Sequence, residues 1–111
     1  MRNAYETVRG GFQEGDVILH ENGWTFGPSY YYHRGHYPEF FLTEEFGIPN
    51  HWDKKIDSSQ LSSYKRIWLF VESSDRFQML SNQEWFQRLR PKLIKEDPLH
   101  HAWYLFQVSQ I

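Results

Sequence analysis

The chain has 111 residues, with 12 lysines and arginines against 14 aspartates and glutamates and no cysteine. Its length fits a single domain over residues 1–111, since domains usually run from about 50 to 250 residues. The lack of cysteine excludes disulfides, thiolate zinc sites and cysteine nucleophiles, and a net charge of −2 gives no basic footprint for a nucleic-acid partner.

The chain opens with a pattern that predicts a helix followed by a strand. Tyr5, Val8 and Phe12 have the spacing of one helix face. Asn3 precedes them as an N-cap. Residues 17–19 are a short continuous apolar run, which is typical of a strand buried on both faces in a parallel sheet.

A second helix is predicted after that strand. Residues 21–24 indicate a loop, and Pro28 is suited to the first turn of a helix through residues 30–32. We expect Gly35 to end this helix. Residues 40–42 predict a short strand, and the pattern stays weak up to about residue 63.

The second half of the chain has clearer signals. Residues 66–72 predict the strongest strand, apolar in its middle and charged at both ends. Ser81 and Glu84 have the spacing of a capping box at the start of a helix. Helical spacing continues to Leu93, with Pro91 ending or kinking the helix, and residues 102–108 predict a closing strand.

This alternation of strands and helices favours an α/β fold. We expect a small three-layer or two-layer domain with helices packed on a short, mostly parallel, Rossmann-like sheet. The roughly thirty residues between 71 and 102 fit one right-handed βαβ crossover. An antiparallel final strand is the alternative.

Three histidines are candidate metal ligands. His33 and His36 lie three residues apart on the predicted second helix, so they would share a face. With His20 or Glu21 at the end of the first strand they could form a three-ligand zinc site. The pattern lacks the glutamate of H-E-x-x-H and a third ligand at fixed spacing, so a solvated helix surface explains it better. The prediction is therefore no metal and no cofactor, with the histidine site as runner-up.

Other catalytic patterns are missing from the sequence. Asp16 and Glu21 flank a strand and would lie ~17 Å apart, too far for the ~5–9 Å carboxylate pair of a glycosidase. The chain has no G-x-S-x-G, G-x-G-x-x-G or G-x-x-x-x-G-K-[ST] motif. We therefore predict no catalytic residue in this chain.

Aromatic residues make up 19% of the chain and supply its candidate binding residues. The candidates follow the first strand, in a cluster that also contains Phe26; they are Trp24, Tyr30, Tyr31, Tyr32 and Tyr37. They could cover the sheet, form an interface with another chain or with membrane headgroups, or stack on a sugar ring. Three consecutive tyrosines on a helix must expose at least one ring.

Three motifs carry a resemblance to a known family. Residues 15–19 read Gly-Asp-Val-Ile-Leu, residues 30–32 are tyrosines, and residues 66–71 read Arg-Ile-Trp-Leu-Phe-Val. In this order they resemble the soluble region of membrane-embedded glycosyltransferases of the dolichyl-phosphate-mannose–protein mannosyltransferase type. Glu14 stands where a proline is common in that family. The resemblance covers roughly residues 5–75.

The resemblance implies an accessory domain on the extracytoplasmic face of a membrane, as part of a larger membrane protein. In that family the catalytic acidic residues lie in loops of the membrane portion, so this chain alone would not transfer sugar. The implied partners are the transmembrane portion of the same protein or the membrane surface, with a glycan or acceptor also possible. The longest apolar run, residues 67–71, is far short of the ~20 residues that cross a bilayer, and the N-terminus lacks a signal-peptide layout.

Two other functions compete with this interpretation. A small metal-dependent hydrolase would use the three histidines as ligands. A self-associating interaction module would bury its aromatic face in a homodimer. Metal binding would distinguish the first of these, and concentration-dependent sedimentation the second.

Overall fold

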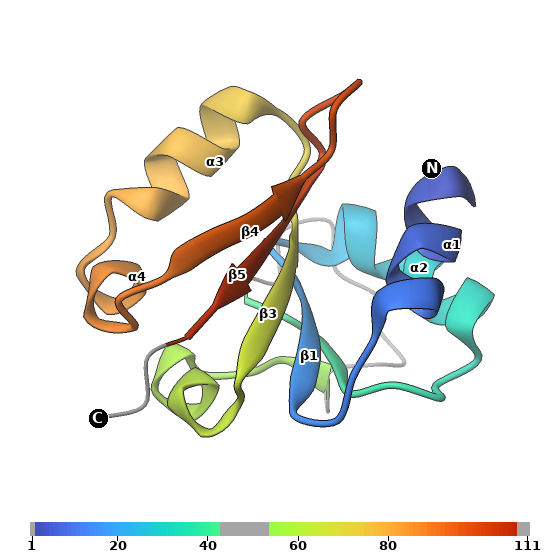
Figure 1. Cartoon of the computed structure of the whole chain (residues 1–111), viewed down its shortest axis with the longest axis horizontal. Coiled ribbons are helices and arrows are strands. Elements are labelled where there is room, and N and C mark those ends of the chain that lie inside the picture. Colours follow the sequence, from blue (N-terminus) through green and yellow to red (C-terminus); the bar gives the residue numbers. More distant parts are fainter. Residues whose placement is uncertain (1, 43–53, 109–111) are drawn as a thin grey trace.

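Five strands form one mixed sheet with helices on both faces in the computed structural model, which describes residues 2–42 and 54–108 (Figure 1). The order of strands across the sheet is β2-β1-β3-β5-β4. In chain order the elements are α1 (Arg2–Gly11), β1 (Asp16–His20), α2 (Gly23–His33), β2 (Glu39–Phe41), the 3₁₀ helix η2 (Ser58–Ser63), β3 (Arg66–Phe70), α3 (Ser74–Ser81), α4 (Glu84–Arg88), β4 (Lys92–Glu96) and β5 (Trp103–Gln107).

The sheet is half parallel and half antiparallel. Strand β1 pairs in parallel with both β2 and β3, whereas β5 runs antiparallel to β3 and to β4. The expected α/β class is confirmed, but the expectation of a mostly parallel sheet is wrong. A strand missed in the sequence explains the difference: α3 and α4 lead into β4, and a hairpin then brings β5 back between β3 and β4 (Figure 1).

Two apolar cores, one on each face of the sheet, give the domain three layers. One core joins side chains of β1, β3 and β5 to η2, α3 and α4. The other joins the opposite faces of the same strands to α1, with Tyr32 of α2 packed against it. The three-layer alternative of the expected fold is the one observed.

The helix predicted from Ser81 is replaced by three elements. Helix α3 begins earlier, with Ser73 as its N-cap accepting a hydrogen bond from the main-chain N–H of Arg76 (3.3 Å). Ser81 is the last residue of α3, so it caps no helix start. Pro91 separates the short helix α4 from β4, which contains Leu93. A proline that blocks helix continuation thus marks a change to a strand.

Helix α2 begins earlier than its sequence pattern indicates. Asn22 is the N-cap, and its side chain accepts a hydrogen bond from the main-chain N–H of Trp24 (2.9 Å). Pro28 therefore lies inside the helix. The helix ends at His33, because Arg34 and Gly35 both have left-handed backbones, with φ of 55° and 68°.

Two motifs that carry the family resemblance contact each other in the fold. Asp16 accepts hydrogen bonds from Arg66 Nε (2.8 Å) and Nη2 (2.6 Å) and from Trp68 Nε1 (2.9 Å). Burial alone would raise the pKa of Asp16, but the hydrogen bonds from Arg66, from the Gln13 N–H and from Trp68 hold it below its ordinary value. Gly15, at φ 94°, makes the turn that delivers this carboxylate. In this structure the two motifs thus lock β1 to β3.

Candidate functional site

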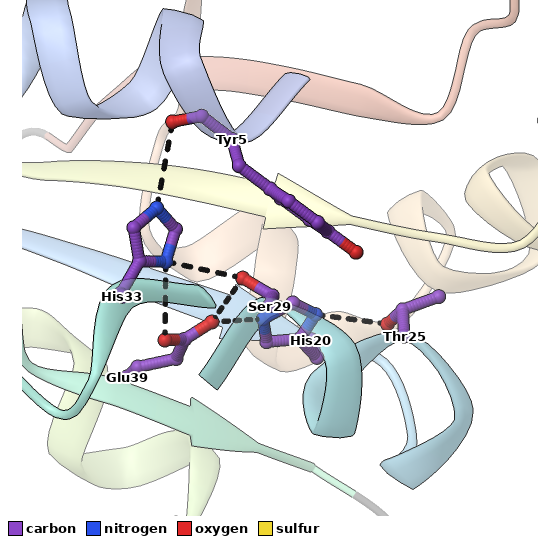
Figure 2. Close-up of polar contacts among 6 residues, drawn as sticks. All are labelled: Tyr5, His20, Thr25, Ser29, His33 and Glu39. Carbon is purple, nitrogen blue, oxygen red and sulfur yellow. Dashed lines mark hydrogen bonds and ion pairs between the residues drawn. The ribbon is translucent and has the colours of Figure 1, made fainter. Parts of the chain in front are cut away.

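A buried polar network lies between α2 and the parallel half of the sheet (Figure 2). It contains His20 at the end of β1, Thr25, Ser29 and His33 on α2, and Glu39 at the start of β2. The side chains of His20 and Glu39 are fully shielded from solvent. Such a cluster is unusual in a core and is therefore the first place to look for chemistry.

One carboxylate oxygen holds most of the network together. Glu39 Oε2 accepts hydrogen bonds from His20 Nε2 (2.6 Å) and from Ser29 Oγ (2.5 Å). The other ring nitrogen of His20 lies 2.9 Å from Thr25 Oγ1. Since His20 Nε2 must carry the proton that it donates to Glu39, a neutral His20 ring accepts the Thr25 hydroxyl proton at Nδ1.

His33 connects the network to α1. Its Nε2 donates to the main-chain oxygen of Tyr5 (3.4 Å). Its Nδ1 faces both Ser29 Oγ (3.3 Å) and Glu39 Oε1 (3.5 Å). Glu39 Oε1 has no closer hydrogen-bond partner in the described part of the chain.

The pKa shifts follow from burial and from these hydrogen bonds. Burial alone would raise the pKa of Glu39, but hydrogen bonds from His20, His33 and Ser29 outweigh it and lower the pKa to about 2. Burial lowers the pKa of His20, against the opposing effect of Glu39. Burial also raises the pKa of Tyr5. At neutral pH the network therefore contains a carboxylate with a neutral His20.

The geometry supports a structural role for these groups. The Ser29 hydroxyl gives its proton to Glu39 and not to a histidine base, so it is not an activated nucleophile. Ser29, His20 and Glu39 are all buried, which closes them to a substrate. What the network does is fasten β1, α2 and β2 to one another through five polar side chains.

The structure brings together only two of the three candidate metal-ligating histidines. His20 and His33 meet at Glu39, whereas His36 lies beyond the end of α2 and is exposed. The prediction that His33 and His36 share a helix face is wrong, because the helix ends between them. Within residues 2–42 and 54–108, no group of three or more His, Asp or Glu side chains is arranged to hold a metal ion.

The five candidate binding residues divide into two sets. Trp24 and Tyr31 are 65% and 66% exposed. The other three, Tyr30, Tyr32 and Tyr37, are half-buried. Tyr30 stacks on a core phenylalanine, and the Tyr32 ring lies 5.1 Å from that of Tyr5. Tyr37 packs on the phenylalanine that directly follows α1. The expectation that the tyrosine run exposes at least one ring is confirmed at Tyr31.

A hollow of about 810 Å³ lies on the other side of the carboxyl end of β1. Its lining includes Glu21, which pairs with Arg76 on α3 (2.9 Å), and apolar side chains such as Met79 and Trp85. Lys55 and Asp57 also line this hollow, on the side of η2.

Sequence reasoning missed Thr25, Ser29 and Glu39. One signal was present: Thr25, Ser29 and His33 are spaced four residues apart and would form a polar stripe on one helix. Beginning the helix at Pro28 hid that stripe. Nothing in the sequence around Glu39 marks it as a buried partner.

Comparison of the chain with family models, with curated proteins and with solved structures gives no match. The family resemblance therefore depends on the three sequence motifs alone.

Proposed function

We propose that this chain is a non-catalytic accessory domain of a membrane glycosyltransferase, and that sugar transfer from a lipid-linked donor takes place in a separate membrane portion. Its place would be the extracytoplasmic face of the membrane. Its role would be to pack against the membrane portion or the membrane surface. A glycan or acceptor stacked on the same aromatic rings is the alternative occupant.

The observation that carries this proposal is an aromatic stripe on the outer face of α2. We use the term α2 stripe for Trp24, Pro28 and Tyr31, which follow one another at helical spacing and are all exposed. A single exposed aromatic residue needs no explanation. Two large rings, each about two-thirds exposed on one helix face, favour a partner that covers them.

The chemistry of these side chains suits a membrane surface. Tryptophan and tyrosine combine a flat apolar body with one polar edge, and both are enriched where hydrocarbon meets headgroups. No helix in the described residues is long and apolar enough to span a membrane. The link to glycosyltransferases depends on the three sequence motifs. We keep the Rossmann-like description as a proposal for the parallel half of the sheet only.

Sedimentation of the full chain with phosphatidylcholine vesicles tests the proposal. We expect the wild-type chain to bind and Trp24→Ser/Tyr31→Ser to lose binding. Leu99→Ser/Met79→Ser is the matched control, because these side chains are 77% and 65% exposed elsewhere on the molecule. Equal binding by both double variants, or none by the wild type, would refute membrane docking through the α2 stripe.

A second candidate function, a homodimeric interaction module, is favoured by strand β4. Every residue of this edge strand is exposed, with Leu93 at 47% and Ile94 at 43%. Two copies would pair along this edge on either side of the irregularity between Leu93 and Lys95, with Lys92 and Glu96 as opposite charges for cross-strand pairs. Analytical ultracentrifugation should then show a dimer that Ile94→Pro abolishes. A monomer at all accessible concentrations would eliminate this candidate.

A further inference from the structure

A second hollow, of about 580 Å³, lies where the last turns of α1 and α2 meet the segment after α2. Its volume is within the range of small-molecule sites, about 300–1,000 Å³. Two arginines, a histidine and three tyrosines surround it: Arg9, Tyr31, Tyr32, Arg34, His36 and Tyr37. His33 of the buried network also lines it.

The two arginines and His36 of this hollow have no charged partner in the described part of the chain. Arg9, Arg34 and His36 are exposed, and none of them makes an ion pair or a side-chain hydrogen bond with another described residue. No acidic side chain of the described residues lines the hollow. Three other arginines each pair with a carboxylate: Arg66, Arg76 and Arg88. In a chain of net charge −2 with its histidines neutral, the guanidinium groups of Arg9 and Arg34 are therefore available to an anion.

The backbone at Arg34 is a second observation. Arg34 closes α2 in the left-handed region at φ 55°, a position where glycine or asparagine is usual. Gly35 follows in the same region at φ 68°. Arg34 thus stands at the rim of the hollow in a backbone conformation that glycine also adopts, so its side chain can be removed without disturbing the turn.

The walls of the hollow are held before any ligand arrives. The Tyr32 ring packs 5.1 Å from that of Tyr5, and the Tyr37 ring lies 4.3 Å from that of Phe12. His33 is fixed beneath them by its contacts with the buried network. Phenolic hydroxyls held in this way can donate to an anion without first losing side-chain freedom.

We propose that this hollow binds a phosphate group, with Arg9 and Arg34 as its main ligands and His36 and the tyrosine hydroxyls as further donors. Planar guanidinium groups suit phosphate oxygens because they donate two parallel hydrogen bonds. The phosphate can be carried by a soluble phosphorylated sugar or by a lipid headgroup. Only the lipid source depends on the function proposed above, since a soluble phosphate requires no membrane.

The test is a heteronuclear NMR titration of the full chain with inorganic phosphate and with glucose 1-phosphate, using glucose as the neutral control. We expect saturable shifts at the amides of residues 8–10 and 31–37 with both phosphates and none with glucose. Arg34→Gly should weaken phosphate binding about tenfold or more, as expected for loss of a charge-assisted hydrogen bond. Glycine suits the backbone at this position, so the variant should fold normally.

Arg90→Gly is the matched control. Arg90 is also exposed and left-handed, at φ 48°, and it lies outside the hollow. We expect this variant to bind phosphate like the wild type. Equal weakening by Arg34→Gly and Arg90→Gly would show only a loss of net charge and would overturn the site.

Vesicle sedimentation shows whether the phosphate comes from a lipid or from a soluble molecule, and it separates this question from the proposed membrane docking. If phosphatidic acid in phosphatidylcholine vesicles strengthens sedimentation of the wild type but not of Arg34→Gly, the lipid source is supported. Soluble phosphate binding with no response to phosphatidic acid supports the soluble source. Absence of both responses overturns the phosphate site, whereas binding to pure phosphatidylcholine bears on the α2 stripe alone.

Discussion

The two faces of helix α2 differ from the usual arrangement, because hydroxyl groups share the buried side with Phe26 while large aromatic rings lie outside. The inner face, with Thr25 and Ser29, is buried against β1 and β2 and carries hydroxyls that bind a histidine and a carboxylate. The outer face, with Trp24 and Tyr31, carries two large aromatic rings that are about two-thirds exposed. Ordinary surface helices have an apolar stripe toward the core and polar residues outside.

This arrangement separates residues that maintain the fold from residues that folding does not need. Buried polar groups are tolerated only when each finds a partner, so substitutions on the inner face should lower stability. The outer rings lose little on unfolding, because they are already largely in water. Substitutions there should change binding and leave stability almost unchanged.

The largest expected effect comes from removing the carboxylate at the centre of the inner face. Glu39→Ala leaves His20 and Ser29 without their acceptor in a buried site. We expect the free energy of unfolding to fall by about 3–5 kcal/mol, a large share of the 5–15 kcal/mol that is usual for a domain. Urea unfolding measures this loss. Glu14→Ala, at an exposed position, is the control, and a similar effect for both would argue against the network.

Acid should destabilise the protein in two stages. His20 has a lowered pKa, so the folded state binds fewer protons than the unfolded state and loses stability as the pH falls below 6.5. Glu39, with a pKa of about 2 against 4.5, stabilises the fold above pH 4.5 and loses that contribution as the pH falls toward 2. This second stage is worth on the order of 3 kcal/mol.

Urea unfolding across this pH range, repeated on Glu39→Gln, checks the assignment. The variant should lack most of the loss below pH 4.5, whereas the remaining loss belongs to Asp16 and other carboxylates with lowered pKa values. If the free energy of unfolding of Glu39→Gln fell below pH 4.5 as much as that of the wild type, the role given to Glu39 would be contradicted.

A smaller effect is expected at Ser29. Ser29→Ala removes one hydrogen bond to a buried carboxylate, which is worth about 2 kcal/mol. Ser63→Ala removes a hydroxyl that is exposed in η2 and should change stability by less than about 0.5 kcal/mol. Thermal or urea unfolding of the two variants gives the comparison directly. A result in which they behave alike would remove Ser29 from the network.

The parallel half of the fold could be predicted from the sequence because its strands are continuous apolar runs. Residues 17–19 and 66–72 gave β1 and β3 with nearly correct bounds, and residues 40–42 gave β2. Strand β4 could not be predicted, since an edge strand with all five residues exposed has no buried run to mark it. That omission also produced the incorrect mostly parallel sheet.

The site was harder to predict than the fold. The aromatic residues were visible from composition, but which rings face outward depends on where α2 begins, and Asn22 rather than Pro28 sets that point. His20 and His33 were recognised as notable, yet Glu39 joins them through strand pairing between β1 and β2 that no local pattern encodes. Side-chain contacts between segments far apart in the chain could therefore not be predicted from the sequence alone.

The smallest expected effect on stability is also the most direct test of the contrast between the faces of α2. Equilibrium urea unfolding should be compared for Trp24→Ser/Tyr31→Ser on the outer face and Thr25→Val/Ser29→Ala on the inner face. We expect the outer pair to change the free energy of unfolding by less than about 1 kcal/mol and the inner pair to lower it by about 3 kcal/mol. A larger loss from the outer pair than from the inner pair would show that the aromatic rings hold the fold together, and would contradict the central claim.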